Sequence, residues 1–288
     1  NAPEKVDKIP STLNWDLFTG PAKLRPFNKT YHPWNWRGWW DYGTGALGDM
    51  ACHILHPVFK GLNLGYPTRV QGSSTLLLQD CAPNAQHVKL VFPARDNMPK
   101  VGQNVELYVG GTNAGTGPDN WVGEGGGLCI FQGTKDTLIC GCYGVNPWLL
   151  SGRKPNVPQT LRRVKDAMKG GHEQDWIRAC KESAGSRVQT KSNFLEAGPF
   201  NEMVVMGVLA VRLQRLNKEL LWDGPNMRFT NIDPNETIKI IKKDTFEVID
   251  GDPKFKTEWT DPINAQEFAA GLIKHNYREG WKLPDMPR

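Results

Sequence analysis

Apolar residues recur at helical spacing in several parts of the chain. Leu47, Met50, Ala51, Ile54, Leu55 and Val58 follow one another in steps of three and four, and two glycines come soon after them. This pattern predicts a helix of about four turns over 47–58. Helices are also expected at 172–182, 200–216 and 265–277, the second with an apolar stripe that includes Met203, Gly207 and Val211.

Between these helices, short runs of β-forming residues alternate with Pro, Gly and Asn. They cover 70–78, 87–92, 105–109, 128–132 and 137–142, and a further strand is expected near 237–241. The residues at 131–138 predict a hairpin with its turn at 133–136, and successive hairpins indicate antiparallel pairing. The order of elements predicts one α+β domain, an open and mainly antiparallel sheet with helices on one face.

The first 33 residues have a different character. Proline stands at positions 3, 10, 21, 26 and 33, and no periodic pattern is sustained between them. We therefore expect a Pro-rich linker or extended arm at 1–33 and the α+β domain at 34–288. The chain starts Asn1-Ala2-Pro3 without Met or a signal-like segment, which favours an origin within a longer polypeptide.

Composition narrows the class of protein. The 35 Lys and Arg residues against 30 Asp and Glu give a net charge of +5, which falls short of the basic stripe of a nucleic-acid binder. The longest apolar run, at 203–211, is shorter than a membrane-spanning helix requires. We therefore expect neither a nucleic-acid partner nor a membrane. The 6 Cys residues form no CxxC pair, and no metal site is expected.

Aromatic residues gather at 31–42, where four of the 11 Trp residues lie within seven positions. Indole rings stack on the C–H faces of sugars, and Arg37 among them offers hydrogen bonds to hydroxyl groups. Clusters of this kind also occur in protein cores and interfaces. The sequence leaves both interpretations open.

The glycines that follow match G-x-G-x-x-G at 43–48. In a dinucleotide site this motif comes after a buried apolar strand and has an acidic residue about twenty positions further on. Here Trp39, Trp40, Asp41 and Tyr42 precede it, and Pro67, Thr68 and Arg69 occupy the later region. The context favours a flexible turn that opens a helix.

Asp49 and His53 form a candidate catalytic pair. Their i,i+4 spacing on the expected helix puts both side chains on one face. A histidine that titrates near neutral pH is suited to take and return a hydroxyl proton, and the carboxylate is suited to bind a second hydroxyl or orient the imidazole. An ordinary polar pair on a core helix remains the alternative, and His56 competes for the histidine's role.

The run Trp36-Arg37-Gly38-Trp39-Trp40-Asp41-Tyr42-Gly43-Thr44-Gly45-Ala46-Leu47-Gly48-Asp49-Met50-Ala51-Cys52-His53 resembles the start of the C-terminal domain in the Gfo/Idh/MocA oxidoreductases, the family of glucose-fructose oxidoreductase and inositol dehydrogenase. Further segments resemble its bacterial branch typical of Bacteroidetes and Planctomycetes. They are 172–181, 192–194, 197–199, 222–224, 226–228 and 278–281.

This resemblance implies a C-terminal domain for substrate binding and oligomerisation, beside an N-terminal Rossmann domain that binds NAD or NADP. The family's catalytic Asp and His fall on Asp49 and His53, and we expect His32, Trp36, Arg37 and Trp39 to line the substrate pocket. The implied substrate is a secondary alcohol on a sugar, cyclitol or glycoside. A homo-oligomer through the open sheet face is expected.

The family's Glu-Lys-Pro motif is missing, since Glu4-Lys5-Val6 lies in the expected arm. We therefore expect the Rossmann domain to lie outside this chain, which by itself would hold no cofactor and be inactive. Two alternatives stay open. One is an NAD-dependent glycoside hydrolase of the same family, and the other is a non-enzymatic module for carbohydrate recognition or assembly.

Overall fold

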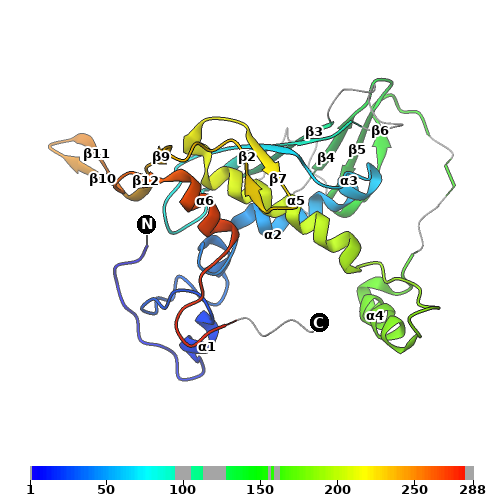
Figure 1. Cartoon of the computed structure of the whole chain (residues 1–288), viewed down its shortest axis with the longest axis horizontal. Coiled ribbons are helices and arrows are strands. Elements are labelled where there is room, and N and C mark those ends of the chain that lie inside the picture. Colours follow the sequence, from blue (N-terminus) through cyan, green and yellow to red (C-terminus); the bar gives the residue numbers. More distant parts are fainter. Residues whose placement is uncertain (1, 95–104, 113–127, 155–156, 159–162, 283–288) are drawn as a thin grey trace.

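The computed structural model describes residues 2–94, 105–112, 128–154, 157–158 and 163–282 (Figure 1). Its α-helices are α1 (Trp15–Thr19), α2 (Gly45–Ile54), α3 (His56–Gly61), α4 (Gly171–Lys181), α5 (Phe194–Arg212) and α6 (Ala265–Ile273). Its strands are β1 (Arg69–Ser74), β2 (Ala85–Phe92), β3 (Val105–Thr112), β4 (Leu128–Gln132), β5 (Thr137–Gly141), β6 (Trp148–Leu149), β7 (Leu220–Asp223), β8 (Arg228–Phe229), β9 (Thr237–Ile238), β10 (Ile241–Ile249), β11 (Asp252–Trp259) and β12 (Ile263–Asn264).

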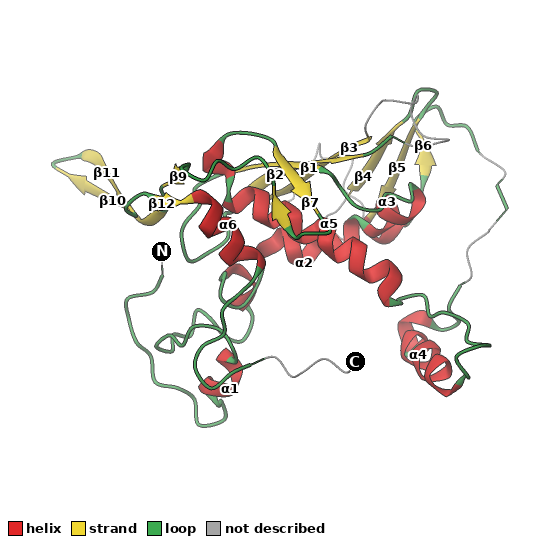
Figure 2. Cartoon of the chain, viewed as in Figure 1, coloured by secondary structure: helices red, strands yellow, loops and turns green. Residues whose placement is uncertain are grey.

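The largest sheet has five strands in the order β3-β2-β1-β7-β8, and every neighbouring pair is antiparallel. A second sheet, β4-β5-β6, includes the expected hairpin at 131–138. Helix α5 packs along β1 and β2, and α2 packs on α5 from the other side (Figure 2). These layers confirm the α+β fold expected from the sequence.

Helix α5 forms the centre of the core. Asn193 caps it by accepting a hydrogen bond from the Glu196 amide, so the helix begins six residues before the predicted start. Gly207 lies between Leu47 of α2 and Val88 of β2, where a side chain would meet both. By length and composition α5 would pass as a membrane span, but its residues 203–211 are largely buried against the sheet and α2, as in a core helix.

The other face of the large sheet is mainly polar along β1 and β2, with the buried Val91 as an exception. Along β1 and β2 it presents Arg69, Gln71, Ser73, His87 and Lys89, none of which is buried. Glu219 accepts a hydrogen bond from Arg69 at 2.8 Å and completes an ion pair at this surface.

The single helix predicted for 47–58 is in fact two. Pro57 has no amide hydrogen for the helical bond to the His53 carbonyl, so α2 ends at Ile54 and α3 starts at His56. One thiol of the second sheet and one of the turn that follows it approach the carbonyls freed at this break. Cys129 Sγ lies 2.9 Å from the Ile54 oxygen, and Cys142 Sγ lies 3.9 Å from the His53 oxygen.

Residues 2–42 contain a small core of their own in place of a continuous extended arm. Trp15, Phe27, Tyr31 and Trp39 are buried against one another, with Trp15 on the short helix α1. The C-terminal segment contacts this aromatic cluster, because Arg278 donates to the Gly20 carbonyl at 2.7 Å and to the Asp16 carboxylate at 2.6 Å.

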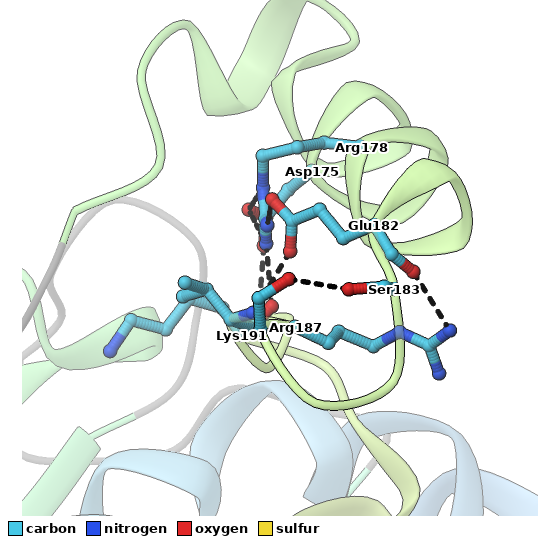
Figure 3. A network of polar contacts seen from close by, with 8 residues as sticks. Asp175, Arg178, Glu182, Ser183, Arg187 and Lys191 are labelled. Carbon is cyan, nitrogen blue, oxygen red and sulfur yellow. Dashed lines mark hydrogen bonds and ion pairs between the residues drawn. The ribbon is translucent and has the colours of Figure 1, made fainter.

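Helix α4 lies outside the main layers with the loop that follows it (Figure 1). Arg178 donates to Asp175 and Glu182, Glu182 accepts from the Val188 amide at 2.9 Å, and Asp175 accepts from the Lys191 amide at 3.1 Å (Figure 3). This network folds the loop back along α4. A hollow of about 510 Å³ lies beside it, lined mainly by apolar atoms from Trp176, Phe194 and Leu195 among others.

Strands β10 and β11 form a hairpin that projects from one end of the molecule (Figure 2). The sequence pattern did not indicate it, and the strand expected at 237–241 is the shorter β9. Helix α6 also ends at Ile273, four residues before the prediction.

Candidate functional site

Helix α2 carries the candidate pair. Leu47 and Ala51 are buried on its inner face, whereas Asp49 and His53 lie one turn apart on the opposite face. The His53 side chain is exposed, and the Asp49 side chain is 40% exposed. The i,i+4 arrangement expected from the sequence is therefore present in α2, at the surface of the molecule.

Arg37 holds the Asp49 carboxylate. Its Nε donates to Asp49 Oδ2 at 3.0 Å, and its guanidinium carbon lies 4.3 Å and 4.6 Å from the ring centres of Trp34 and Trp36. Cation–π contact and the ion pair together fix the orientation of the guanidinium group. Arg37, Trp36 and Asp49, all predicted site residues, thus form one cluster, together with Trp34.

His53 has an aromatic neighbour that the sequence analysis missed. The Tyr143 ring meets the imidazole edge to face, with 5.4 Å between ring centres, and remains 67% exposed. The Tyr143 backbone is left-handed, with φ of 61°, which is costly for a residue with a side chain. The adjacent Gly144 is a local sign of a turn at this point. The sequence pattern gives no sign that residue 143 lies close to residue 53.

The thiols at the α2 break explain this proximity. Cys129 and Cys140 are opposite each other on β4 and β5, and both are buried. Burial, with Cys140 nearby, raises the pKa of Cys129 to about 12, so this thiol stays protonated and is able to donate. Its contact with the Ile54 carbonyl joins the second sheet to α2, and the contact of Cys142 with the His53 carbonyl brings the neighbouring Tyr143 beside His53.

His56 has different partners. Its Nε2 lies 2.8 Å from Oε1 of Glu196, and Lys60 donates to the other oxygen of the same carboxylate. Burial alone would raise the pKa of Glu196, but the hydrogen bonds from Lys60 and His56 outweigh it and lower the pKa. This cluster ties α3 to the first turn of α5, whereas His53 makes its ring contact at the surface.

The other two predicted pocket residues belong to the aromatic cluster of residues 2–42. Trp39 is 8% exposed, with its ring edge to face against Tyr31 at 4.8 Å. His32 meets the Phe18 ring edge to face at 5.0 Å. The structure therefore separates Trp39, which is buried, from the surface that carries Arg37 and Asp49.

The glycines at 43–48 serve close packing. A Cβ on Gly43 would lie 2.6 Å from the Arg37 carbonyl oxygen, and one on Gly48 would overlap Thr44. Gly45 has φ of +70° and abuts Ala82. Only a single-residue bridge at Trp39 precedes them, in place of the buried strand a dinucleotide motif requires. These residues do not fit a nucleotide cradle, as the sequence context had indicated.

Within the described ranges, no group of three or more His, Cys, Asp or Glu side chains is placed to hold a metal ion. Cys140 and Cys142 are instead buried parts of the second sheet and the turn that follows it.

Residues 2–89 match the family model described as "Oxidoreductase family, C-terminal alpha/beta domain" of the Gfo/Idh/MocA group. The matched segment runs from the aromatic cluster through α2 and α3 into β2, and it contains Arg37, Asp49 and His53. No curated protein matches the chain. By this match and by its α+β fold, the part of the chain that carries the candidate pair is similar to the C-terminal domain of an oxidoreductase family.

Proposed function

We propose that this chain is the substrate-binding half of an NAD(P)-dependent oxidoreductase that acts on a secondary alcohol of a sugar, cyclitol or glycoside. The observation that carries the proposal is the surface of α2, where Asp49 is fixed by Arg37 and His53 is exposed beside Tyr143. The family match over residues 2–89 supports the oxidoreductase class.

The chain's own residues have defined tasks in this proposal. The Asp49 carboxylate accepts hydrogen bonds from substrate hydroxyl groups, and its ion pair with Arg37 keeps it in place. His53 takes the proton of the reacting hydroxyl group. Trp34, 69% exposed, and Tyr143 offer aromatic faces on which the C–H side of a sugar ring packs.

The nicotinamide coenzyme needs another binding site, because the glycines at 43–48 are engaged in packing. We propose that a separate nucleotide-binding domain supplies that site and the hydride acceptor. The substrate half is then testable by itself, because polyol binding to α2 does not require the coenzyme.

The first experiment measures binding of a panel of sugars, cyclitols and glycosides to this chain by calorimetry and by saturation-transfer NMR. We expect one of these classes to bind, and we expect Asp49→Ala to abolish that binding. Glu173→Ala is the matched control, because Glu173 is an exposed carboxylate on α4. A chain that binds none of the panel, or an Asp49→Ala variant that binds normally, contradicts the proposal.

The second experiment measures NAD(P)-dependent oxidation with the nucleotide-binding domain present. His53→Ala and Asp49→Asn should each lower kcat/KM by about 10²-fold, as expected for loss of an acid/base group or a positioned hydrogen bond. His172→Ala, on the exposed side of α4, is the control. Glycoside cleavage without accumulation of reduced coenzyme would instead favour the hydrolase.

A further inference from the structure

A hollow of about 330 Å³ lies where three distant parts of the chain meet, near the base of the β10–β11 hairpin. Its lining consists of Arg215 from the turn after α5, residues 237–239 at β9, and Trp259 at the end of β11. In Figure 1, β9 lies at the end of the molecule from which the hairpin projects. This volume is at the lower end of the range for small-molecule sites, about 300–1,000 Å³.

The hollow is lined by two cations and no acidic residue. In the part of the chain that the structure describes, neither Arg215 nor Lys239 makes a hydrogen bond or an ion pair through its side chain. Glu236, the acidic residue nearest to Lys239 in the sequence, is paired with Lys218 at 2.6 Å. Glu219, the nearest to Arg215, is paired at the polar face of the large sheet. The lining residues therefore leave a positive charge without a counterion.

The polar groups of the hollow are held by their surroundings. The guanidinium carbon of Arg215 lies 4.8 Å from the ring centre of Trp259, and this cation–π contact orients the group while its N–H donors stay available. Thr237 and Lys239 are exposed and alternate with Ile238, which is buried in the main core. Because side chains alternate along a strand, the hydroxyl and ammonium groups are on the same exposed side.

A phosphate monoester fits this set of groups. It carries about −1.5 to −2 charge at pH 7 and has three strong acceptor oxygens. Arg215 and Lys239 match its charge, and the Thr237 hydroxyl adds a third donor. A carboxylate has one charge and would leave one of the two cations unpaired. Trp259 is 41% exposed, so its indole offers an apolar contact to carbon atoms attached to the phosphate.

We propose that this hollow is a second ligand site, which binds a small phosphate monoester. Arg215 and Lys239 donate charge-assisted hydrogen bonds to phosphate oxygens, Thr237 donates to a third oxygen, and the organic group packs on Trp259. The site does not involve Asp49 or His53, so it does not rest on the function proposed above.

The test uses calorimetry and ¹H–¹⁵N NMR of the full chain at about 0.15 M salt, where surface attraction is screened. Phenyl phosphate is the probe, because it has no polyol group, and inorganic phosphate and phenol are the comparisons. Phenyl phosphate should bind about 5-fold more tightly than inorganic phosphate, because the ring adds its contact with the indole. One indole N–H signal, identified by its loss in Trp259→Phe, should shift with phenyl phosphate and not with phenol.

Arg215→Gln with Lys239→Gln should weaken binding of phenyl phosphate by about 10-fold or more. Arg153→Gln with Lys154→Gln is the matched control, because it removes the same charge from exposed positions after β6. Asp49→Ala should leave binding unchanged, which separates this site from the one on α2.

Thermal unfolding verifies that each variant is folded. Lys239→Gln alone, at an exposed position, should still weaken binding by about 3-fold or more if the double variant does not fold. The proposal is overturned if phenyl phosphate does not bind, if it binds without shifting the Trp259 signal, or if inorganic phosphate binds as tightly. It is also overturned if the control pair weakens binding as much as the double variant, or if Asp49→Ala abolishes binding.

Discussion

Tyr143 shows how the candidate site uses a residue that is unfavourable for the backbone. Its φ of 61° is tolerated by glycine and asparagine far better than by an aromatic residue. The ring is nevertheless held beside His53, although most of its surface is exposed and little packing repays the strain. Such strain with little packing in return favours a binding role for the ring.

We predict that Tyr143→Gly leaves the free energy of unfolding unchanged or raises it by up to about 1 kcal/mol, because strain is relieved. The same variant should weaken polyol binding. Urea denaturation and calorimetry measure the two effects, with Tyr143→Asn as a second residue that accepts left-handed geometry. A large loss of stability in both variants would mean that the ring is structural.

Glu196 predicts how stability depends on pH. Its pKa in the folded chain lies below the ordinary value of 4.5, so the unfolded chain binds more protons in acid. The carboxylate's contribution is therefore present at neutral pH and is lost as the pH falls below 4.5 and through the folded pKa.

Glu196→Gln should accordingly lower the urea midpoint at pH 7 and have a smaller effect near pH 3.5, about one unit below the ordinary carboxyl value. Glu173→Gln, on the exposed side of α4, serves as the control. An equal decrease of the urea midpoint at both pH values would show that the shape of the Glu196 side chain matters more than its charge.

At the scale of elements, β1 and α5 come into backbone contact at Gly72. A Cβ built on Gly72 would lie 2.5 Å from the Val211 amide nitrogen and 2.6 Å from the Ala210 carbonyl carbon. Both are backbone atoms of α5, so a side chain here forces the helix away from the sheet.

We therefore predict that Gly72→Ala destabilises the chain by about 2 kcal/mol or more, as measured by chemical denaturation. Gly271→Ala is the matched control in α6, where an added Cβ meets nothing within 4 Å. Relief of the glycine penalty in a helix should make that variant more stable by about 0.5–1 kcal/mol. If Gly271→Ala destabilised the chain more than Gly72→Ala, the close packing of β1 on α5 would be contradicted.

Periodicity revealed the elements whose apolar residues face one core. The sequence predicted the sheet with helices on one face and the hairpin of β4 and β5, and it also predicted α4, which lies outside the main layers, because all these patterns are local. The break at Pro57 was missed because apolar spacing continues across it from Ile54 to Val58. The β10–β11 hairpin was missed because polar and charged residues dominate both strands, and Phe246 and Val248 are the only apolar residues at 242–248.

The candidate site also has a part that local sequence patterns predict and a part that they do not. Asp49 and His53 follow from one helix and its spacing, and Arg37 from its place in a short aromatic run. Tyr143 joins them through tertiary contacts, among them those of Cys129 and Cys142 with carbonyl groups at the end of α2. Trp39 is the opposite case. Its closeness to Arg37 in the sequence predicted a place in the pocket, but its ring is buried against Tyr31.

At the scale of the whole molecule, Arg25 links the aromatic cluster of residues 2–42 to the main body. It donates to the Asp41 carboxylate and, at 2.6 Å, to Asp80 in the loop after β1. Its side chain is 21% exposed, and the two carboxylates are similarly shielded.

Arg25→Met should leave two shielded carboxylates near each other without a cation, and cost on the order of 3 kcal/mol. We also expect faster limited proteolysis within residues 2–42, detected by mass spectrometry. Lys23 is exposed and lies two residues before Arg25 in the sequence, so Lys23→Met should change neither the stability nor the rate of proteolysis. Uniform destabilisation without preferential cleavage would show that this segment unfolds together with the rest.

The antiparallel pairing of β1 with β7 has a consequence for how the chain is made. Arg69 of β1 and Glu219, next to β7, are 150 residues apart in the sequence. At ordinary rates of synthesis, that separation takes on the order of ten seconds to translate. During that interval Val70, Val88 and Leu90 have neither α5 nor β7 to cover them. Until residues 194–223 are made, the apolar face of the β1–β2 hairpin therefore lacks its cover.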